Sequence, residues 1–248
     1  MIRLKNKNEI SLMREAGILL AECHQQVEKL IKPGTTTLDI DAFVENFLHD
    51  HGAKPEQKGF HGYPYATCGS VNDVICHGFP NDTPLKEGDI VTIDFVVNLN
   101  GWLADSAWSY AVGKISEEAQ QLMDTTLEAL FVGINQARVG NRVGDISHAI
   151  QTFAESKNYG VVREFAGHGI GKKMHEDPFI PHFGPADQGA FLEEGMVITI
   201  EPMLNVGEPY CKIEDDGWTA RTQDGSLSTQ YEHTLAITKD KPFILTEL

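Results

Sequence analysis

The chain has 248 residues, of which 41% are hydrophobic and 23% charged, so it can bury a sizeable core as one large domain or two small ones. Its formal net charge of -16 and its pI near 4.9 argue against a nucleic-acid substrate, because binding to phosphate backbones depends on clustered lysine and arginine. The polar N-terminus lacks the apolar segment of a signal peptide, and no later stretch is long enough to cross a bilayer. We therefore expect a cytoplasmic protein without membrane association.

Apolar residues at helical spacing predict four helices. The first carries apolar residues three or four positions apart and ends before Pro33-Gly34. The last two open at a plausible capping residue and have a glycine nearby at their ends. The predicted ranges are Asn8 to about Ile31, Thr37 to Gly52, Ser116 to Ala137 and Asp145 to Lys157.

Between and after these helices lie runs rich in β-branched residues, which are typical of strands. No low-complexity linker marks a domain boundary, so the pattern predicts a mixed α/β chain of the α+β kind. The predicted strands are Asp89 to Val97, Ala107 to Val112, Gly160 to Glu164, Met196 to Leu204 and His233 to Thr238.

One sequence pattern occurs twice. Residues 87–94 read Glu-Gly-Asp-Ile-Val-Thr-Ile-Asp and residues 194–201 read Glu-Gly-Met-Val-Ile-Thr-Ile-Glu, so each apolar strand ends on an acid. A second acid follows downstream in each case, Asp105 and Glu232, where we expect it to open another strand. One internal copy does not make a solenoid, so we expect two similar halves that share a central site.

An ionised carboxylate among apolar strand residues costs free energy unless a positive charge compensates it. For a single acid, exposure to water at the end of a strand, or an ion pair with an arginine, is as good an interpretation as a functional role. Four acids in a repeated pattern favour a metal ion, because the chain has only 20 Lys and Arg against 36 Asp and Glu. The candidate ligands are Asp94, Asp105, Glu201 and Glu232.

A fifth ligand is expected from His168, because the glycines of Gly167-His-Gly-Ile-Gly let the backbone approach closely. His175 follows in Met-His-Glu-Asp-Pro, which is not a zincin helix because Pro178 would break it. A lone histidine is more often a structural or surface residue, and we interpret five others in this way: His24, His49, His51, His148 and His182.

Four carboxylates and one imidazole, without a thiolate, form an oxygen-rich donor set that suits two first-row divalent ions. Such a pair generates a hydroxide nucleophile at neutral pH. The chain has no G-x-S-x-G nucleophile elbow and no Walker motif. A mononuclear iron site would leave at least two of the acids without a role.

Seven short stretches, in this order, carry a family resemblance across nearly the whole chain. They are Ser70–Gly78, Gly88–Asp94, Ala104–Ser106, Gly167–Gly171, His175–Pro178, Ile200–Met203 and Tyr231–Thr234. In this combination the chain resembles type I methionine aminopeptidases. The segment from His175 to Glu201 is short and lacks the long insertion of type II enzymes.

The resemblance implies the pita-bread (creatinase/aminopeptidase) fold, in which two pseudo-symmetric halves surround a central antiparallel sheet. We therefore expect one catalytic domain over residues 1–248, with halves at roughly 1–115 and 116–248. The implied activity is removal of the N-terminal methionine from nascent proteins and peptides that have a small second residue. In such enzymes a hydroxide held by two metal ions attacks the first peptide bond.

The resemblance also implies a role for each ligand. Asp94 would bind one metal ion, His168 and Glu201 the other, and Asp105 and Glu232 would bridge them. Glu201 would in addition act as the proton shuttle. The expected ions are Co²⁺, Mn²⁺, Fe²⁺ or Zn²⁺, because ligand identity alone does not select among them.

Two further histidines are implied to be catalytic and substrate-binding. His175 would contact the scissile amide or its oxyanion, and His77 would lie near the amide nitrogen. An ordinary hydrogen-bonding role is the alternative for both. The methionine side chain needs a closed apolar slot, and family positions place around it Tyr63, Cys68, His77 and Trp218, with Phe60 nearby. The chain departs from some relatives at Phe60, Gln57 and Met174, which leaves the details of this slot open.

The remaining expectations also rest on the resemblance. Asn72, Val74 and Ser228 match positions at which relatives hold a monovalent cation, Na⁺ or K⁺. The expected partners are nascent polypeptides and peptides with N-terminal methionine, with transient ribosome association and a monomeric enzyme. Two alternatives stay open: an X-Pro aminopeptidase or prolidase, which usually carries a further N-terminal domain, and a non-catalytic pita-bread binding protein, which typically loses metal ligands.

Overall fold

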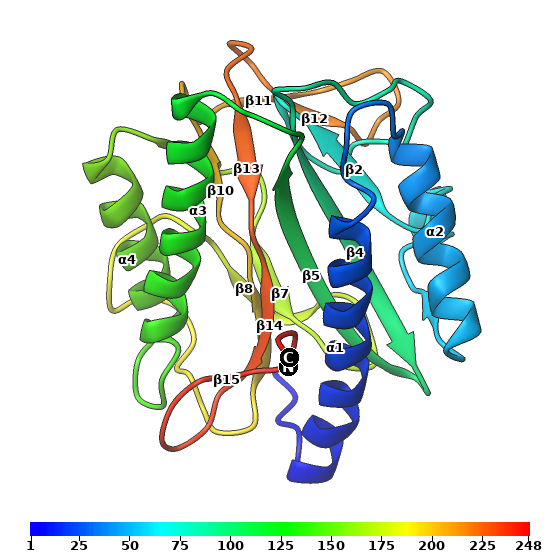
Figure 1. Cartoon of the computed structure of the whole chain (residues 1–248). Helices are drawn as coiled ribbons and strands as arrows, with labels where there is room; N and C mark the ends of the chain where they lie inside the picture. Colours follow the sequence, from blue (N-terminus) through cyan, green and yellow to red (C-terminus); the bar gives the residue numbers. More distant parts are fainter.

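The computed structural model describes residues 1–248 and contains four α-helices packed on antiparallel strands (Figure 1). All four predicted helices are present, with ends within three residues of those predicted, and none combines the length and hydrophobicity needed to cross a bilayer. The helices are α1 (Lys7–Glu28), α2 (Thr37–Asp50), α3 (Glu117–Gln136) and α4 (Val143–Ser156).

Side-chain caps fix where these helices begin. At α1 the Asn6 side chain accepts from the backbone N–H of Glu9 at 3.1 Å, and the Glu9 carboxylate accepts from Asn6 N at 2.9 Å. Such a cap stabilises a helix by about 1 kcal/mol. Helix α4 begins two residues before the predicted Asp145, because Asp145 lies in the first turn and accepts from the backbone N–H of Arg142 at 2.7 Å.

The strands of the first half include one long hairpin, which is formed by β4 and β5. Strands β4 and β5 are joined by a two-residue turn, Asn100-Gly101, in which both residues have positive φ. Asn-Gly is the preferred sequence for such a turn, and the residues directly before and after it already pair with each other. These strands are β1 (Lys54–Pro55), β2 (Cys68–Val71), β3 (Val74–Cys76), β4 (Ile90–Leu99) and β5 (Trp102–Ala111), and a 3-10 turn, η1 (Phe60–Gly62), lies between β1 and β2.

The strands of the second half are shorter. They are β6 (Gly160–Val161), β7 (Gly167–Gly169), β8 (Glu176–Ile180), β9 (Val197–Ile200), β10 (Met203–Asn205), β11 (Cys211–Ile213), β12 (Ala220–Thr222), β13 (Ser228–Gln230), β14 (His233–Ala236) and β15 (Phe243–Ile244). Hydrogen bonding divides all the strands into four antiparallel sheets, of which the largest has the order β15-β14-β9-β7-β8.

Three strand predictions were wrong in detail. Asp94 does not end a strand, because β4 continues to Leu99. Asp105 does not open a strand: β5 begins at Trp102, so Asp105 lies inside it opposite Val96 of β4. The predicted strand over Met196 to Leu204 is broken into β9 and β10 at Glu201-Pro202. Proline has no N–H to donate to a ladder, which explains the break.

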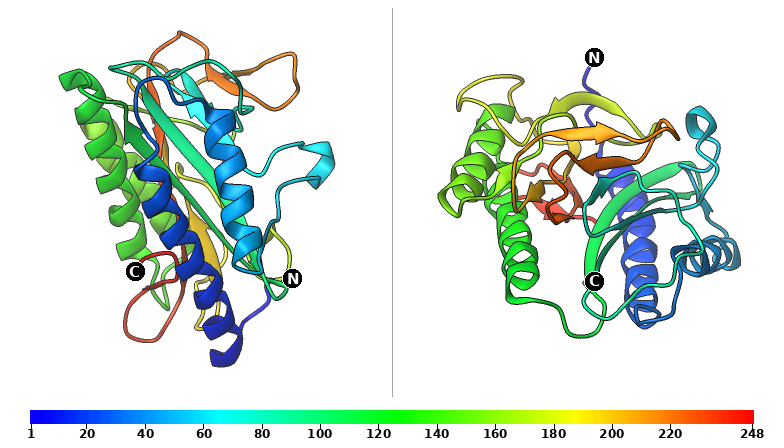
Figure 2. Two further views of the ribbon diagram at one scale, coloured as in Figure 1. Left: turned by 45° about the vertical axis from the view of Figure 1, so that its right-hand side comes forward. Right: turned by 90° about the horizontal axis from the view of Figure 1, so that it is seen from above.

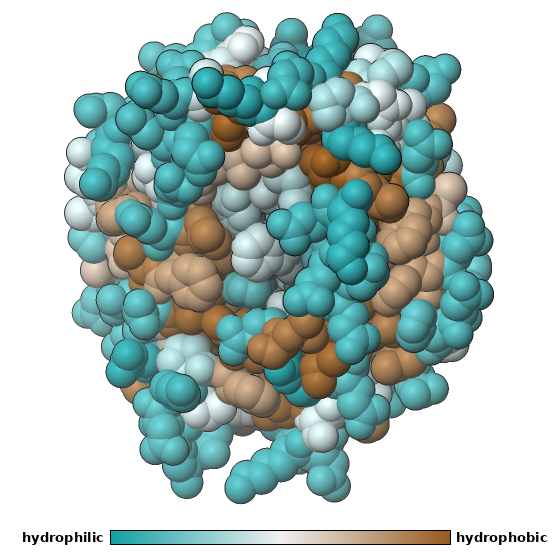
Figure 3. All heavy atoms as spheres, viewed as in Figure 1, coloured by the Kyte–Doolittle hydropathy of each residue, from teal (hydrophilic) through white to brown (hydrophobic).

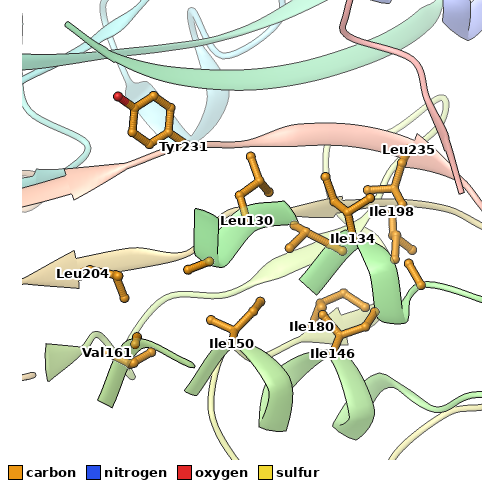
Figure 4. Packing of buried hydrophobic residues seen from close by; sticks show 14 of the residues in the cluster. Leu130, Ile134, Ile146, Ile150, Val161, Ile180, Ile198, Leu204, Tyr231 and Leu235 are labelled. Carbon is orange, nitrogen blue, oxygen red and sulfur yellow. The ribbon is translucent and has the colours of Figure 1, made fainter. Parts of the chain in front are cut away.

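The helices form two pairs, α1 with α2 and α3 with α4, on the same side of the strands (Figure 2). Each pair covers its own hydrophobic cluster. Beneath α1 and α2, Leu20 and Val44 pack with Phe95 of β4. Figure 4 shows the cluster beneath α3 and α4, where Leu130 and Ile150 are buried with residues of β9 and β14. Each fully buried aliphatic side chain stabilises the fold by about 1.5–3 kcal/mol.

The two halves meet where β5 lies beside β14. The Ser106 hydroxyl donates to the Glu232 carbonyl at 2.7 Å, and the Glu232 N–H donates to the Ala107 carbonyl at 2.9 Å. These bonds join residues more than 120 positions apart in the sequence. The acids Asp105 and Glu232 are thereby held next to each other at the junction.

Candidate metal centre

A cavity of about 840 Å³ opens on the strand side of the molecule, and none of its lining residues belongs to the four α-helices. All the predicted metal-binding, catalytic and substrate-binding residues line it, whereas the residues of the expected monovalent-cation site do not. The predicted metal ligands are Asp94, Asp105, His168, Glu201 and Glu232, and the predicted catalytic and substrate-binding residues are His77, His175, Tyr63, Cys68, Trp218 and Phe60.

The five predicted ligands come from both halves of the chain. Asp94 lies in the middle of β4 and Asp105 in the neighbouring β5. His168 is the central residue of β7, Glu201 follows the last residue of β9, and Glu232 lies between β13 and β14. The first half therefore supplies two carboxylates, and the second half supplies two carboxylates and the imidazole.

The ligand atoms are close together. His168 Nε2 lies 3.7 Å from Asp105 Oδ2 and 3.7 Å from Glu201 Oε1. One donor atom each from Asp105, His168 and Glu232 falls within 4.8 Å of the other two. This spacing suits groups that share a small cation.

Burial raises the pKa of every carboxyl group in the cluster, and repulsion from neighbouring carboxylates raises three of the four pKa values further. Burial raises the pKa of Asp94 to about 7. Burial, followed by the charge of Asp94, raises the pKa of Glu201 to about 8. The pKa values of Asp105 and Glu232 lie well above the ordinary range for the same two reasons. The protein alone thus leaves four acids in unfavourable surroundings.

No basic side chain compensates these acids. None of the four carboxylates forms an ion pair with a lysine or arginine. Asp105 Oδ1 and Glu232 Oε1 are buried and have no hydrogen-bond partner. Buried carboxylate oxygens without partners are costly. The cluster therefore fits divalent metal ions, which would supply both the charge and the missing contacts.

The imidazole of His168 is held in a tautomer that can bind a metal ion. Its Nδ1 lies 2.9 Å from the carbonyl of Gly169, so Nδ1 carries the proton and donates. The opposite nitrogen, Nε2, then presents a lone pair to the carboxylates. Burial lowers the pKa of His168 to about 3, which keeps the ring neutral. A fixed neutral tautomer of this kind is typical of metal-binding histidines.

Two glycines flank His168 because the neighbouring strands approach closely. A Cβ on Gly167 would lie 2.4 Å from the carbonyl oxygen of Thr199 in β9. A Cβ on Gly169 would lie 2.1 Å from the carbonyl oxygen of Asp177 in β8. Real Cβ atoms do not come so near, so β7 fits between its neighbours only as Gly-His-Gly. The prediction that the glycines permit close backbone approach is confirmed.

Three residues that the sequence analysis did not assign to the site hold Glu201. The Thr199 hydroxyl donates to Glu201 Oε1 at 2.9 Å, and Gln230 Nε2 donates to Oε2 at 3.3 Å. His182, which is buried, accepts from the Glu201 backbone N–H at 3.1 Å. Thr199 could have been found, because it occupies the Thr-Ile-acid position of the repeated pattern. Gln230 and His182 carry no comparable signal.

The rings of His77 and His175 stand at the cavity without hydrogen bonds to the protein. The His175 ring is edge-on to His168 with 4.5 Å between centroids, and the His77 ring is edge-on to Phe165 at 5.1 Å. Burial lowers the pKa of His77 to about 4, and burial and His61 lower the pKa of His175. Both rings are therefore neutral near pH 7 and free to bond to a ligand.

A buried ion pair holds the loop that carries His175. Glu176 Oε2 accepts from Lys5 Nζ at 2.8 Å, and Glu176 Oε1 accepts from the backbone N–H groups of Lys172 and Lys173 at 3.1 and 3.3 Å. Lys5 is nearly completely buried. The N-terminal segment thus fixes one wall of the cavity.

The expected methionine slot is an aromatic part of the same cavity. The rings of Tyr63 and Trp218 meet edge to face at 5.0 Å, and Tyr63 donates its hydroxyl to the Thr67 carbonyl at 2.9 Å. Cys68 is a buried thiol whose pKa burial raises well above the ordinary value, so it is not a thiolate. Gln57 also lines the cavity and bonds to β4 on both sides of Phe95.

The residues of the expected monovalent-cation site are largely engaged with one another. The Asn72 carbonyl accepts from Ser228 N at 2.9 Å, and the Asn72 side chain bonds to Asp89 and to the N–H of Ile90. The Ser228 hydroxyl oxygen is buried and has no partner. The Asn72 carbonyl and side-chain oxygens therefore each accept one hydrogen bond already, whereas the Ser228 hydroxyl oxygen has none.

Comparison with known proteins agrees with this geometry. Residues 11–239 match metallopeptidase family M24. The chain is 50% identical to a methionine aminopeptidase of Clostridium perfringens over 246 residues, which cover 99% of each protein. It is 46% identical to methionine aminopeptidase 1 of Bacillus subtilis over 248 residues, which cover 100% of each. The crystal structure of methionine aminopeptidase from Rickettsia prowazekii superposes with a TM-score of 0.98 at 42% identity, and the match covers 99% of this chain and 100% of that one.

Proposed function

Because the chain belongs to metallopeptidase family M24 and, within it, to the methionine aminopeptidases, we propose that it removes the N-terminal methionine from peptides and nascent proteins with a small second residue. The same comparisons confirm the resemblance recognised in the motifs, the pita-bread fold and the class of enzyme, a metal-dependent aminopeptidase.

One observation carries the proposal: four buried carboxylates and a neutral imidazole share a cavity without any lysine or arginine partner. A protein that only bound peptides would have no reason to retain this arrangement, because it costs free energy unless cations are present. The non-catalytic alternative is therefore disfavoured.

We assign Asp94 to one metal ion, His168 and Glu201 to the second, and Asp105 and Glu232 to bridging positions. The buried, unpartnered oxygens of Asp105 and Glu232 support the bridging assignment, because each residue has an oxygen left to offer a second ion. When bound, Co²⁺, Mn²⁺, Fe²⁺ or Zn²⁺ would polarise the scissile carbonyl and lower the pKa of water.

The protein's own groups would handle the proton and the substrate. The Glu201 carboxylate accepts a proton from the attacking water, whose oxygen bonds to the carbonyl carbon, and returns it to the leaving amine as the C–N bond breaks. Thr199 and Gln230 support this role, because they orient the Glu201 oxygens. His175 and His77, neutral and unpartnered, bond to the two sides of the scissile amide.

The specificity for methionine is assigned to the aromatic slot. A thioether side chain packs favourably against aromatic edges, and the slot is lined by Tyr63, Cys68, His77 and Trp218, with Phe60 nearby. The proposed preference for a small second residue rests on the family resemblance alone. We further propose a monovalent cation, Na⁺ or K⁺, near Asn72, Val74 and Ser228, and a monomeric cytoplasmic enzyme that meets nascent chains transiently at the ribosome.

The decisive experiment is metal reconstitution. Metal-free protein should leave Met-Ala-Ser intact, and addition of Mn²⁺ or Co²⁺ should restore release of methionine. Met-Lys-Ser tests the preference for a small second residue, and Ala-Pro-Ser tests X-Pro activity. The proposal fails if Met-Ala-Ser stays intact with each of the four ions, and cleavage of Ala-Pro-Ser instead would indicate an X-Pro aminopeptidase. Elemental analysis of protein purified without added metal identifies the native ion.

A further inference from the structure

A second cavity, of about 460 Å³, lies between α1 and α3 on the helix side of the molecule. It shares no lining residue with the cavity of the metal centre. Figure 3 shows this face of the molecule, hollowed in the middle between the two helices. A volume of this size is typical of sites for small organic ligands.

Aromatic side chains from separate elements form the walls of this cavity. Trp108 of β5 and Tyr231, which precedes β14, meet edge to face with 5.3 Å between centroids. Phe131 of α3 lies at the mouth and is 39% exposed. Leu127, one turn earlier in α3, completes the apolar lining. Such walls suit a flat aromatic ring.

His233 offers the cavity a buried hydrogen-bond donor. The residue is 2% exposed, and its Nδ1 lies 2.8 Å from the Thr246 hydroxyl oxygen. That oxygen already accepts from the N–H of Thr234 at 3.1 Å, and the Thr246 hydroxyl proton has no other acceptor. The hydroxyl therefore donates to His233 Nδ1, which places the ring proton on Nε2.

No protein atom accepts from His233 Nε2, although His233 lines the cavity and its other nitrogen is bonded. Its ring is edge-on to Trp108 at 5.4 Å, so the aromatic wall and the donor adjoin. The second histidine of the cavity, His24, is already engaged, with Nδ1 2.8 Å from the Tyr110 hydroxyl and Nε2 3.2 Å from the Ser106 carbonyl. His233 thus supplies the one imidazole donor left for a ligand.

The mouth of the cavity is negative. Glu28 of α1 and Glu247 line it, and no lysine or arginine does. Neither glutamate forms an ion pair. The two carboxylates favour a positive charge at the outer end of a ligand and disfavour a negative one.

We propose that this cavity binds a small aromatic carbonyl compound, such as an aromatic amide, that carries a positive charge at its far end. The ring packs between Trp108 and Phe131, the carbonyl oxygen accepts from His233 Nε2, and the charged end lies near Glu28 and Glu247. This site is separate from the metal centre and needs neither metal ions nor peptidase activity.

The test is a fluorescence titration of the full chain with three probes, monitored through tryptophan. We expect 4-(aminomethyl)benzamide to bind most tightly, benzamide at least about 5-fold more weakly, and benzoate at least about 5-fold more weakly again. The reason is that the negative mouth of the cavity attracts a positive charge and repels a negative one. Absence of a response to every probe up to 10 mM would overturn the proposal. Equal binding of the cation and of benzoate would overturn it as well.

Variants locate the binding site. Trp108→Phe should abolish the fluorescence response, and a response that persists would place the probe near Trp102 or Trp218, outside this cavity and against the proposal. Phe131→Ala should weaken binding at least about 5-fold, by loss of an aromatic wall. The matched control is Phe191→Ala, which removes an exposed phenylalanine that lines neither cavity. Equal affinities of Phe131→Ala and Phe191→Ala would contradict the assignment.

A further variant tests the donor. His233→Phe keeps an aromatic ring and removes the N–H, so 4-(aminomethyl)benzamide should bind at least about 10-fold more weakly. If this variant does not fold, the comparison of Phe131→Ala with Phe191→Ala and the titration of Trp108→Phe still test the proposal. Unchanged affinity in folded His233→Phe would exclude the carbonyl contact.

Discussion

Thr234 and Asp105 exchange two hydrogen bonds across the junction of the halves: the Asp105 N–H donates to Thr234 Oγ1 at 3.0 Å, and the Thr234 hydroxyl donates to the Asp105 carbonyl at 2.8 Å. We predict that Thr234→Val destabilises the protein by about 1–3 kcal/mol, because it leaves a buried N–H without an acceptor. Urea denaturation measures the change. Thr234→Ser keeps the hydroxyl and should lose less than half as much; equal losses would show that the methyl group, not the bonds, matters.

Asp105→Asn should have opposite effects on the metal-free and metal-loaded protein. Without metal it replaces an acid whose pKa is raised by burial and by the neighbouring carboxylates, so the melting temperature should stay unchanged or rise. With Mn²⁺ the metal-induced increase in melting temperature should disappear, and activity should fall at least about 100-fold, since a ligand loss exceeds the 10–100-fold typical of outer-shell changes. Asp82→Asn, in an exposed loop, is the control. A marked drop in the metal-free melting temperature would contradict the electrostatic argument.

Thr199→Val tests whether the repeated pattern contains a positioning residue. It removes the bonds from the Thr199 hydroxyl to Glu201 and from the His168 N–H to Thr199. We expect kcat to fall about 10–100-fold, as for other changes behind metal ligands, with little change in KM. The equivalent threonine of the first copy, Thr92, bonds to Ser109 instead. Thr92→Val should therefore leave kcat within about 3-fold, and similar losses in both variants would refute a specific role of Thr199.

His24 should make the protein sensitive to acid. Burial lowers its pKa from 6.5 to about 3 in the folded state. On acidification the unfolded chain therefore takes up a proton at His24 before the folded protein does. The contribution of His24 to stability is constant well above pH 6.5 and is lost as the pH drops toward 3, by up to about 1.4 kcal/mol per pH unit. His24→Gln should make the fall in stability shallower in urea denaturation between pH 6.5 and 4.5. The exposed His49→Gln is the control, and a slope unchanged in His24→Gln would exclude the contribution.

The sequence predicted the elements that depend on local signals. Helix α1 follows from periodic apolar residues and the α4 start from a capping acid, although Asp145 acts from within the first turn. The acids Asp94 and Glu201 were recognised because the repeated pattern placed each of them at the end of an apolar run.

What the sequence did not predict depends on contacts between distant segments. Strands of two or three residues such as β1 and β7 exist only because a neighbour pairs with them. The place of Asp105 inside β5 depends on the Asn100-Gly101 turn, a local signal that the strand prediction overlooked. Gln230 and His182 reach Glu201 only in the folded chain, so spacing along the sequence does not reveal them.

The Gly-His-Gly strand makes the metal centre vulnerable to substitutions that leave every ligand in place. A methyl group added to either flanking glycine would clash with the backbone of β8 or β9. The clash would displace the imidazole of His168. Such a variant would keep all five donor residues, so its sequence would still suggest a metal-binding protein. Its affinity for metal ions would nevertheless be lost. In this protein, the absence of two side chains is as much a condition for holding metal as the presence of the histidine between them.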